Sequence, residues 1–127
     1  SASAVAIAWV LGGSKEALVS LAPKSVTTPV AMGITQQLGG HPSLTAVLVI
    51  ATGILGAMIG PHILNLLRIT DWAARGVALG TASHGIGTAR AMQINEVAGA
   101  FSGLAMGLNA LATAMLLPLF WHLFFAN

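Results

Sequence analysis

The sequence predicts an all-α integral membrane protein, and the prediction depends on composition, two long apolar stretches and two interrupted helical segments. Of the 127 residues, 56% are hydrophobic and 6% are charged, and the mean hydropathy is +0.87. A soluble domain carries about 25% charged residues, so this chain has too few to cover a water-facing surface. The composition excludes an ordinary soluble domain and a disordered tail, and without a basic stripe we expect no nucleic-acid partner.

Two apolar stretches are long enough to cross a lipid bilayer. Residues 43–67 and residues 97–125 contain no charged side chain. About 20 apolar residues, each rising about 1.5 Å along a helix, cover the roughly 30 Å hydrocarbon layer. Both are therefore predicted to be transmembrane helices. The opening stretch, residues 1–13, is apolar but short for a span and lacks the basic start of a signal peptide. We therefore expect either a fragment of a longer membrane protein or an incomplete first span.

Two further segments begin as helices, break, and resume. The first runs over residues 16–38, and prolines at both ends of residues 23–29 interrupt it, because proline removes a backbone donor and disfavours helix in the preceding residue. The second runs over residues 71–93, and three glycines make residues 80–88 flexible. Each segment is therefore predicted to be a broken helix.

The two halves of the chain align at an offset of 56 residues (81 − 25), which places one break over the other. The pattern predicts a single membrane domain over residues 1–127 with two structural repeats. Repeat 1 covers about residues 15–67 and repeat 2 about residues 71–123. Each repeat is a broken helix, discontinuous or re-entrant, followed by a long transmembrane helix.

The broken segment can cross the membrane as a discontinuous helix or return as a re-entrant hairpin. Crossing gives parallel repeats, whereas re-entry gives inverted repeats. Crossing also places Lys15, Arg68 and Arg75 on one side, which agrees with the positive-inside rule if that side is cytoplasmic. On this basis the sequence favours crossing.

A broken helix inside a bilayer indicates a polar site, because free backbone groups survive there only against protein or water. Half-helix N-termini attract anions such as carboxylates, and transporters build binding sites at such breaks. The alternative is that each hydroxyl only caps a helix or bonds to its own backbone. The predicted substrate-binding residues are Lys24, Ser25, Thr27, Thr28, Thr81, Ser83, His84, Thr88 and Arg90.

Three of these residues carry or can acquire charge. Lys24 can neutralise an anionic substrate, or its stem can extend to the membrane interface. Arg90 can bind a carboxylate with two hydrogen bonds, or act as an interfacial anchor or as a partner of Glu96. His84 titrates near neutral pH, so it can accept a coupled proton, or backbone carbonyls can satisfy it.

Enzyme and metal signatures are missing from the sequence. It has no cysteine, no nucleophile elbow, no H-E-x-x-H and no phosphate-binding loop, and its histidines lack metal-ligand spacing. We therefore expect no catalytic residue, no metal and no cofactor. Glycine recurs at every fourth position, at Gly56 and Gly60 and again at Gly99, Gly103 and Gly107, which predicts close helix packing.

The two breaks resemble the paired signatures of the LrgB/CidB (YohK-like) family of membrane proteins. The matching residues are PKSVTTPVAM at 23–32, and ARG at 74–76 running into GTASHGIGTAR at 80–90. The GILG at 53–56 and the GAFS at 99–102 match as well. Family members are about twofold longer, so the chain resembles the C-terminal part of one.

The resemblance implies two functions. Bacterial members are described as holin/antiholin-like proteins that modulate murein hydrolase activity and cell lysis beside a small LrgA/CidA-type partner. A plant member translocates glycolate and glycerate across the plastid inner envelope, and bacterial relatives are linked to pyruvate uptake. We favour a carrier of small monocarboxylates, because a simple lysis pore needs neither broken helices nor Lys24, His84 and Arg90. The expected setting is the bacterial inner membrane (the plastid inner envelope for a plant protein), as a multi-pass homo-oligomer.

Overall fold

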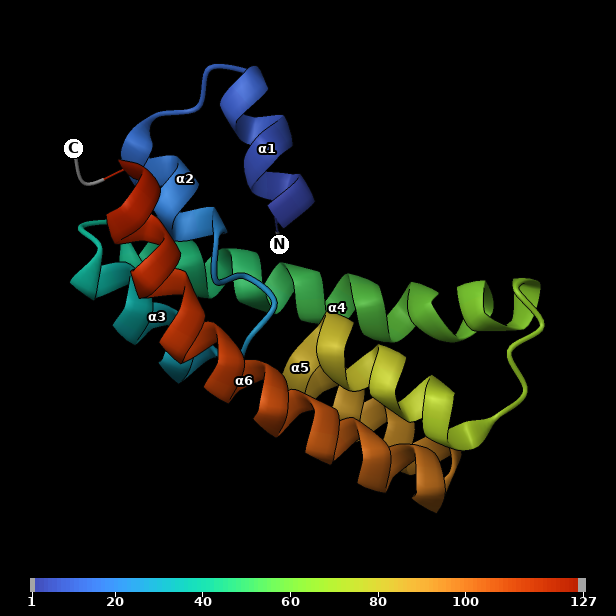
Figure 1. Cartoon of the computed structure of the whole chain (residues 1–127). Coiled ribbons are helices and arrows are strands. Elements are labelled where there is room, and N and C mark those ends of the chain that lie inside the picture. Colours follow the sequence, from blue (N-terminus) through green and yellow to red (C-terminus); the bar gives the residue numbers. More distant parts are fainter. Residues whose placement is uncertain (1, 126–127) are drawn as a thin grey trace. The chain divides into compact units, whose positions relative to one another are not determined.

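Six helices and no strand make up residues 2–125, the part of the backbone that the computed structural model describes; side chains are described for residues 3–123. The all-α prediction is confirmed over this range. The helices, shown in Figure 1, are α1 (Ala2–Val10), α2 (Lys15–Leu21), α3 (Thr28–Gln37), α4 (Pro42–Leu66), α5 (Trp72–Ile94) and α6 (Glu96–Phe125).

Helices α4 and α6 coincide with the two predicted spans to within one residue at each end. Both are long and apolar enough to cross a membrane, with mean hydropathies of 2.1 for Pro42–Leu66 and 1.7 for Glu96–Leu123. In the most apolar 18-residue stretch of each helix, only 17% of α4 and 6% of α6 is buried within the chain. A core helix of a soluble protein would be mostly buried, so this exposure favours contact with lipid.

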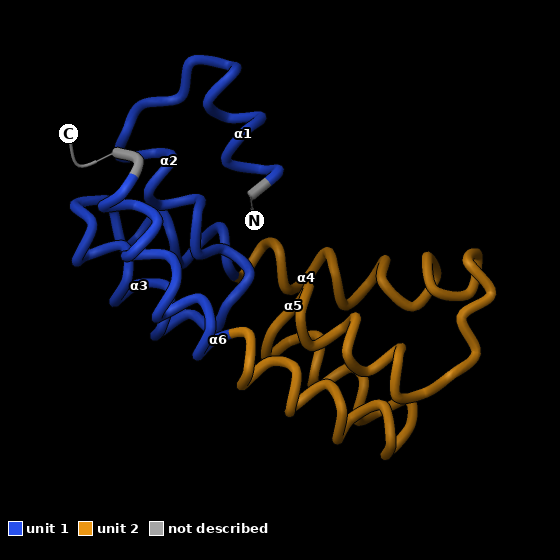
Figure 2. The backbone as a smooth tube through the Cα atoms, viewed as in Figure 1, with its two compact units in different colours: residues 1–49, 110–127 blue, residues 50–109 orange. Residues whose placement is uncertain are grey.

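The chain divides into two compact units (Figure 2). Unit 1 contains Ser1–Val49 and Ala110–Asn127, and unit 2 contains Ile50–Asn109. Each long helix therefore contributes one part to each unit. The units do not coincide with the two predicted repeats.

In unit 1 the predicted first break separates α2 from α3. Ser14 caps α2 by accepting a hydrogen bond from the Ala17 backbone N–H at 3.3 Å, and Thr27 is the N-cap residue of α3. The non-helical residues are 22–27, whereas the prediction placed the break at 23–29. The difference arises because Pro29 lies in the first turn of α3, where a proline loses no helical hydrogen bond.

Helices α2 and α3 form a helical hairpin that packs on α4. Ser20, before the break, and Thr35, after it, both lie within hydrogen-bonding distance of the Thr45 hydroxyl. Val26, in the connection, packs with Ala31 against Val49, one turn further along α4. Because the chain reaches Val49 and then returns to Thr45, the two short helices run in opposite directions.

Helix α5 in unit 2 reverses direction in the same way. His84 has φ 43° and ψ −131°, which interrupts the helix. Before it, Gly76 and Gly80 pack on the backbone of Ala98 and Ser102, so this arm runs in the same direction as α6. After it, the Thr88 hydroxyl contacts the same Ser102, so the second arm runs back.

Gly99 packs on Met92, which continues the return of the second arm along α6. Figure 1 shows the two arms of α5 as yellow and gold ribbons beside α6. The favoured prediction of a segment that continues in one direction is wrong for unit 2, because the dihedral angles at His84 turn the chain back. The break is also narrower than residues 80–88, since the three glycines there remain in helical arms.

Candidate functional site

The predicted site residues fall into three groups. Ser83, His84 and Thr88 are buried at the α5 break, in unit 2. Lys24, Ser25, Thr27 and Thr28 are half-buried at the α2–α3 connection, in unit 1. Thr81 and Arg90 have exposed side chains. The structure thus brings three of the nine together in one buried cluster and four at the other break.

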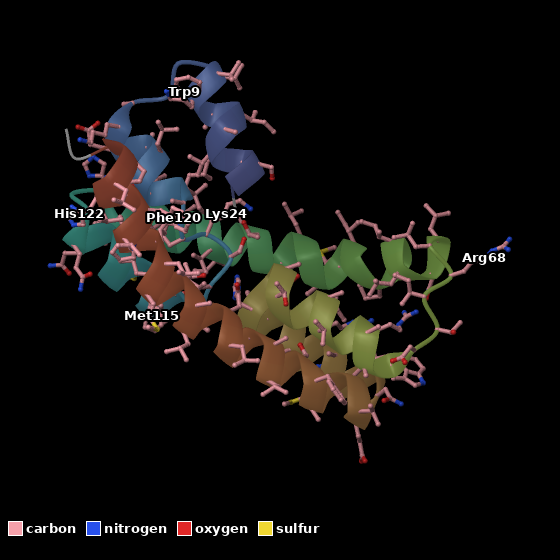
Figure 3. All side chains as sticks on the ribbon, viewed as in Figure 1. Trp9, Lys24, Arg68, Met115, Phe120 and His122 are labelled. Carbon is pink, nitrogen blue, oxygen red and sulfur yellow. The ribbon has the colours of Figure 1, made fainter. Side chains whose placement is uncertain are left out.

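The α2–α3 connection leads into the N-terminus of α3, and its backbone N–H groups are bonded within the connection. The backbone N–H of Lys24 bonds to the Leu21 carbonyl at 3.2 Å, and that of Val26 bonds to the Pro23 carbonyl at 3.1 Å. Thr27 makes no capping hydrogen bond with its side chain, so the capping alternative does not describe this hydroxyl. Figure 3 shows Lys24 at this connection.

Three fully buried hydroxyls in unit 1 were not predicted as functional: Ser20, Thr35 and Thr45. The Thr35 and Thr45 hydroxyl oxygens lie 2.8 Å apart, and Thr45 also donates to the Ser20 carbonyl at 3.0 Å. The Ser20 hydroxyl donates to the Glu16 carbonyl at 2.7 Å and accepts from the His41 N–H at 2.9 Å. Because every hydroxyl has a partner, the cluster attaches the hairpin to α4 without a ligand.

His84 forms the tip of the α5 hairpin. Its backbone conformation suits glycine, and for another residue it costs about 1–3 kcal/mol, a cost typical of functional sites. The side chain is 3% exposed. A Cβ built on Gly53 would lie 2.7 Å from His84 Cε1. The missing side chain at Gly53 therefore allows the imidazole to pack against the central part of α4.

The second arm and α6 satisfy the polar groups on one side of the break. The Thr88 hydroxyl donates to the His84 carbonyl at 2.9 Å and lies 2.9 Å from the Ser102 hydroxyl. A hydroxyl has one proton, so Ser102 donates to Thr88. The Asn109 amide donates to the Thr81 carbonyl at 3.4 Å. Thr88 therefore matches the alternative to substrate binding, in which a hydroxyl bonds to the backbone of its own helix.

Ser83 differs from Thr88. Its hydroxyl oxygen is fully buried and has no hydrogen-bond partner. It faces Gly56 of α4 so closely that a Cβ built there would collide with it. Leaving a buried hydroxyl unpaired costs about 1–3 kcal/mol, so its presence calls for a physical explanation.

Two arginines have structural partners. Arg90 donates to the Gln93 side chain at 3.3 Å. Arg75, which was not predicted as functional, is 9% exposed, donates to the Ile69 carbonyl at 2.9 Å and lies 5.2 Å over the Trp72 ring. This cation–π contact and hydrogen bond hold the α4–α5 connection in place. Nothing in the local sequence pattern marks Arg75 as buried.

Two long apolar helices and the polar groups buried at a helix break define an α-helical membrane protein. The chain belongs to the LrgB-like family, whose model matches residues 1–123. This confirms the family resemblance and, together with the apolar helices, membrane localisation.

The chain is similar to several bacterial proteins. It is 46% identical over 99 residues to uncharacterized protein YwbG of Bacillus subtilis (strain 168), covering 78% of this chain and 44% of the relative. It is 36% identical over 116 residues to Holin-like protein CidB of Staphylococcus epidermidis, covering 91% and 51%. The chain thus spans about half the length of these relatives. No solved structure matches it.

Proposed function

We propose that the protein acts in the bacterial inner membrane as an antiholin-like regulator of murein hydrolase activity and cell lysis, with a small LrgA/CidA-type partner. The observation that carries this proposal is the family relationship, since relatives at 36% identity bear the name Holin-like protein CidB. The two apolar helices support a multi-pass membrane protein.

A second candidate, favoured by the site, is a carrier of small 2-oxo or 2-hydroxy monocarboxylates. A hydroxyl without a partner and a strained backbone lie buried at a helix break, where transporters bind solutes. A regulator that only contacts a partner protein needs neither feature. Within unit 1, Lys24 lies at the α2–α3 connection, and a cation at a helix break suits an anionic solute.

Flux through proteoliposomes distinguishes these candidates. If the protein is a carrier, we expect saturable uptake of labelled pyruvate or glycolate without leakage of an enclosed dye. Lys24→Ala and His84→Ala should each reduce this uptake at least tenfold. Unsaturable leakage of unrelated solutes would instead indicate a pore. Co-purification with the small holin-like subunit and no flux would support the regulator and contradict the carrier.

We also propose that both hairpins are re-entrant and that the two repeats have inverted topology. Three pairs of corresponding features support the repeat, at an offset of 57 (71 − 14) in place of the 56 that aligned the two breaks in the sequence. The helix N-caps Ser14 and Asp71 each accept from the backbone N–H three residues later. The same offset relates the break at Thr27 to the break at His84. It also relates the buried hydroxyl of Thr45 to that of Ser102.

Sidedness follows from the hairpins and the charges. A hairpin returns to the side on which it began, so α4 and α6 cross in opposite directions and the hairpins enter from opposite sides. Arg68 and Arg75 then lie at the base of the second hairpin, while Lys15 lies at the base of the first. By the positive-inside rule the α4–α5 connection is cytoplasmic. Figure 3 shows Arg68 extending from this connection.

Single cysteines test this topology, because the chain contains none of its own. We expect Thr70→Cys and Asn95→Cys to react with a membrane-impermeant maleimide only after cells are permeabilised. His41→Cys should react in intact cells. Opposite labelling of Thr70→Cys and Asn95→Cys would show that α5 crosses the membrane and would contradict the proposal.

A further inference from the structure

The Ser83 hydroxyl is unusual even among the buried hydroxyls of this protein. Ser20, Thr35, Thr45, Thr88 and Ser102 are also buried, and each has a hydrogen-bond partner in its unit. Within residues 3–123, Ser83 Oγ is the buried side-chain polar atom left without one. The fold therefore satisfies its structural hydroxyls, and the exception lies next to the strained residue His84.

Glycines make room for this hydroxyl. A Cβ at Gly56 of α4 would occupy the position of Ser83 Oγ, and a Cβ at Gly87 of the returning arm would collide with Ser83 Cβ. The two arms of the hairpin and α4 thus approach Ser83 closely, yet none of their polar groups is a hydrogen-bond partner of its hydroxyl. An oxygen of a bound solute would supply the missing partner, and its entry would require the hairpin to separate from Gly56 of α4, which the hydroxyl contacts.

The surroundings indicate which solute oxygen would bind. Most charged residues of unit 2 lie near the bases of its helices (Arg68, Asp71, Arg75 and Glu96), and Arg90, midway along the second arm of α5, has an exposed side chain that bonds to Gln93. Ser83 lies at the hairpin tip beside Gly56, within the central part of α4. A neutral hydroxyl among glycines suits an uncharged oxygen, because it can donate to a carbonyl or accept from a hydroxyl.

We propose that Ser83 is a specificity-determining residue that hydrogen-bonds the C2 oxygen of a 2-hydroxy or 2-oxo acid. This inference rests on the carrier function proposed above. A site that pairs a buried hydroxyl with a solute oxygen rejects an analogue that lacks this oxygen, since the hydroxyl then stays unpaired. Glycolate and pyruvate should therefore be preferred over acetate and propionate, which have no C2 oxygen.

Ser83→Ala in the full protein, reconstituted in vesicles, tests the proposal. We expect the wild type to prefer glycolate over acetate by about tenfold in kcat/KM, as one hydrogen bond provides. Ser83→Ala should bring that ratio close to one while the melting temperature stays equal or rises, because the variant removes an unpaired buried hydroxyl. Glycolate, and not acetate, should raise the melting temperature of the wild type, and the variant should lose this effect.

Ser102→Ala is the matched control, since Ser102 is equally buried but has a partner. It should lower the melting temperature and reduce uptake of both acids alike. A Ser83→Ala protein that keeps the preference for glycolate, or that behaves like Ser102→Ala, would overturn the role of Ser83 and leave the carrier function standing. A wild type that neither takes up nor is stabilised by any of these acids would overturn both.

Discussion

Replacing Gly80 with valine is expected to lower the free energy of unfolding by about 3 kcal/mol, at the upper end of the usual cost of overpacking. A Cβ at Gly80 would collide with the backbone carbonyl of Ser102 in α6, and one at Gly76 would collide with that of Ala98. A flexible side chain could rotate away, but a helix backbone cannot. The first arm of α5 would have to separate from α6.

Gly103→Val provides the control for this prediction. A Cβ at Gly103 would have no other group within 4 Å, while the intrinsic cost of valine in a helix is the same at both positions. Unfolding of the purified protein by sodium dodecyl sulfate, followed by circular dichroism, gives both free energies. Equal losses in the two variants would show that α5 does not pack directly on α6.

The second large effect concerns the backbone at His84. We expect His84→Gly to be more stable than His84→Ala by about 1–2 kcal/mol, because glycine adopts φ 43° and ψ −131° without the strain that alanine retains. This order reverses the usual one, since within a helix glycine is less favourable than alanine by about 1 kcal/mol. Both variants lack the imidazole, so the comparison isolates the backbone.

Ala89→Gly is the control, because at this exposed helical position of α5 alanine should be more stable than glycine. It should lose about 1 kcal/mol in the same denaturation experiment. If His84→Gly were instead the less stable of the two His84 variants, the chain would not reverse at His84. The hairpin, and with it the inverted topology, would then be wrong.

The glycine-spacing prediction was partly confirmed. Gly56 and Gly60 pack against Ser83 and Leu79 of α5, as their spacing indicated. Gly103 and Gly107 continue the pattern of Gly99, yet nothing lies within 4 Å of a Cβ built on either. Spacing therefore identifies positions where a helix can approach closely, and the fold decides which of them another helix reaches.

The sequence by itself determined the helical class, the two long apolar helices and the location of both breaks. These features depend on local properties: a run of apolar residues longer than the bilayer is thick, and prolines or glycines that interrupt backbone hydrogen bonding. For the same reason residues 23–29 and 80–88 could be recognised as breaks and their hydroxyls as candidate site residues.

Only the tertiary structure decided the direction of the chain after each break and the partner of each hydroxyl. The reversal depends on the dihedral angles of one residue, His84, and on packing against α6. Thr88 and Ser83 are both hydroxyl residues in one segment, yet the first finds Ser102 and the second faces Gly56. Those partners lie 14 and 27 positions away along the chain (102 − 88 and 83 − 56), and local sequence patterns carry no information over such separations.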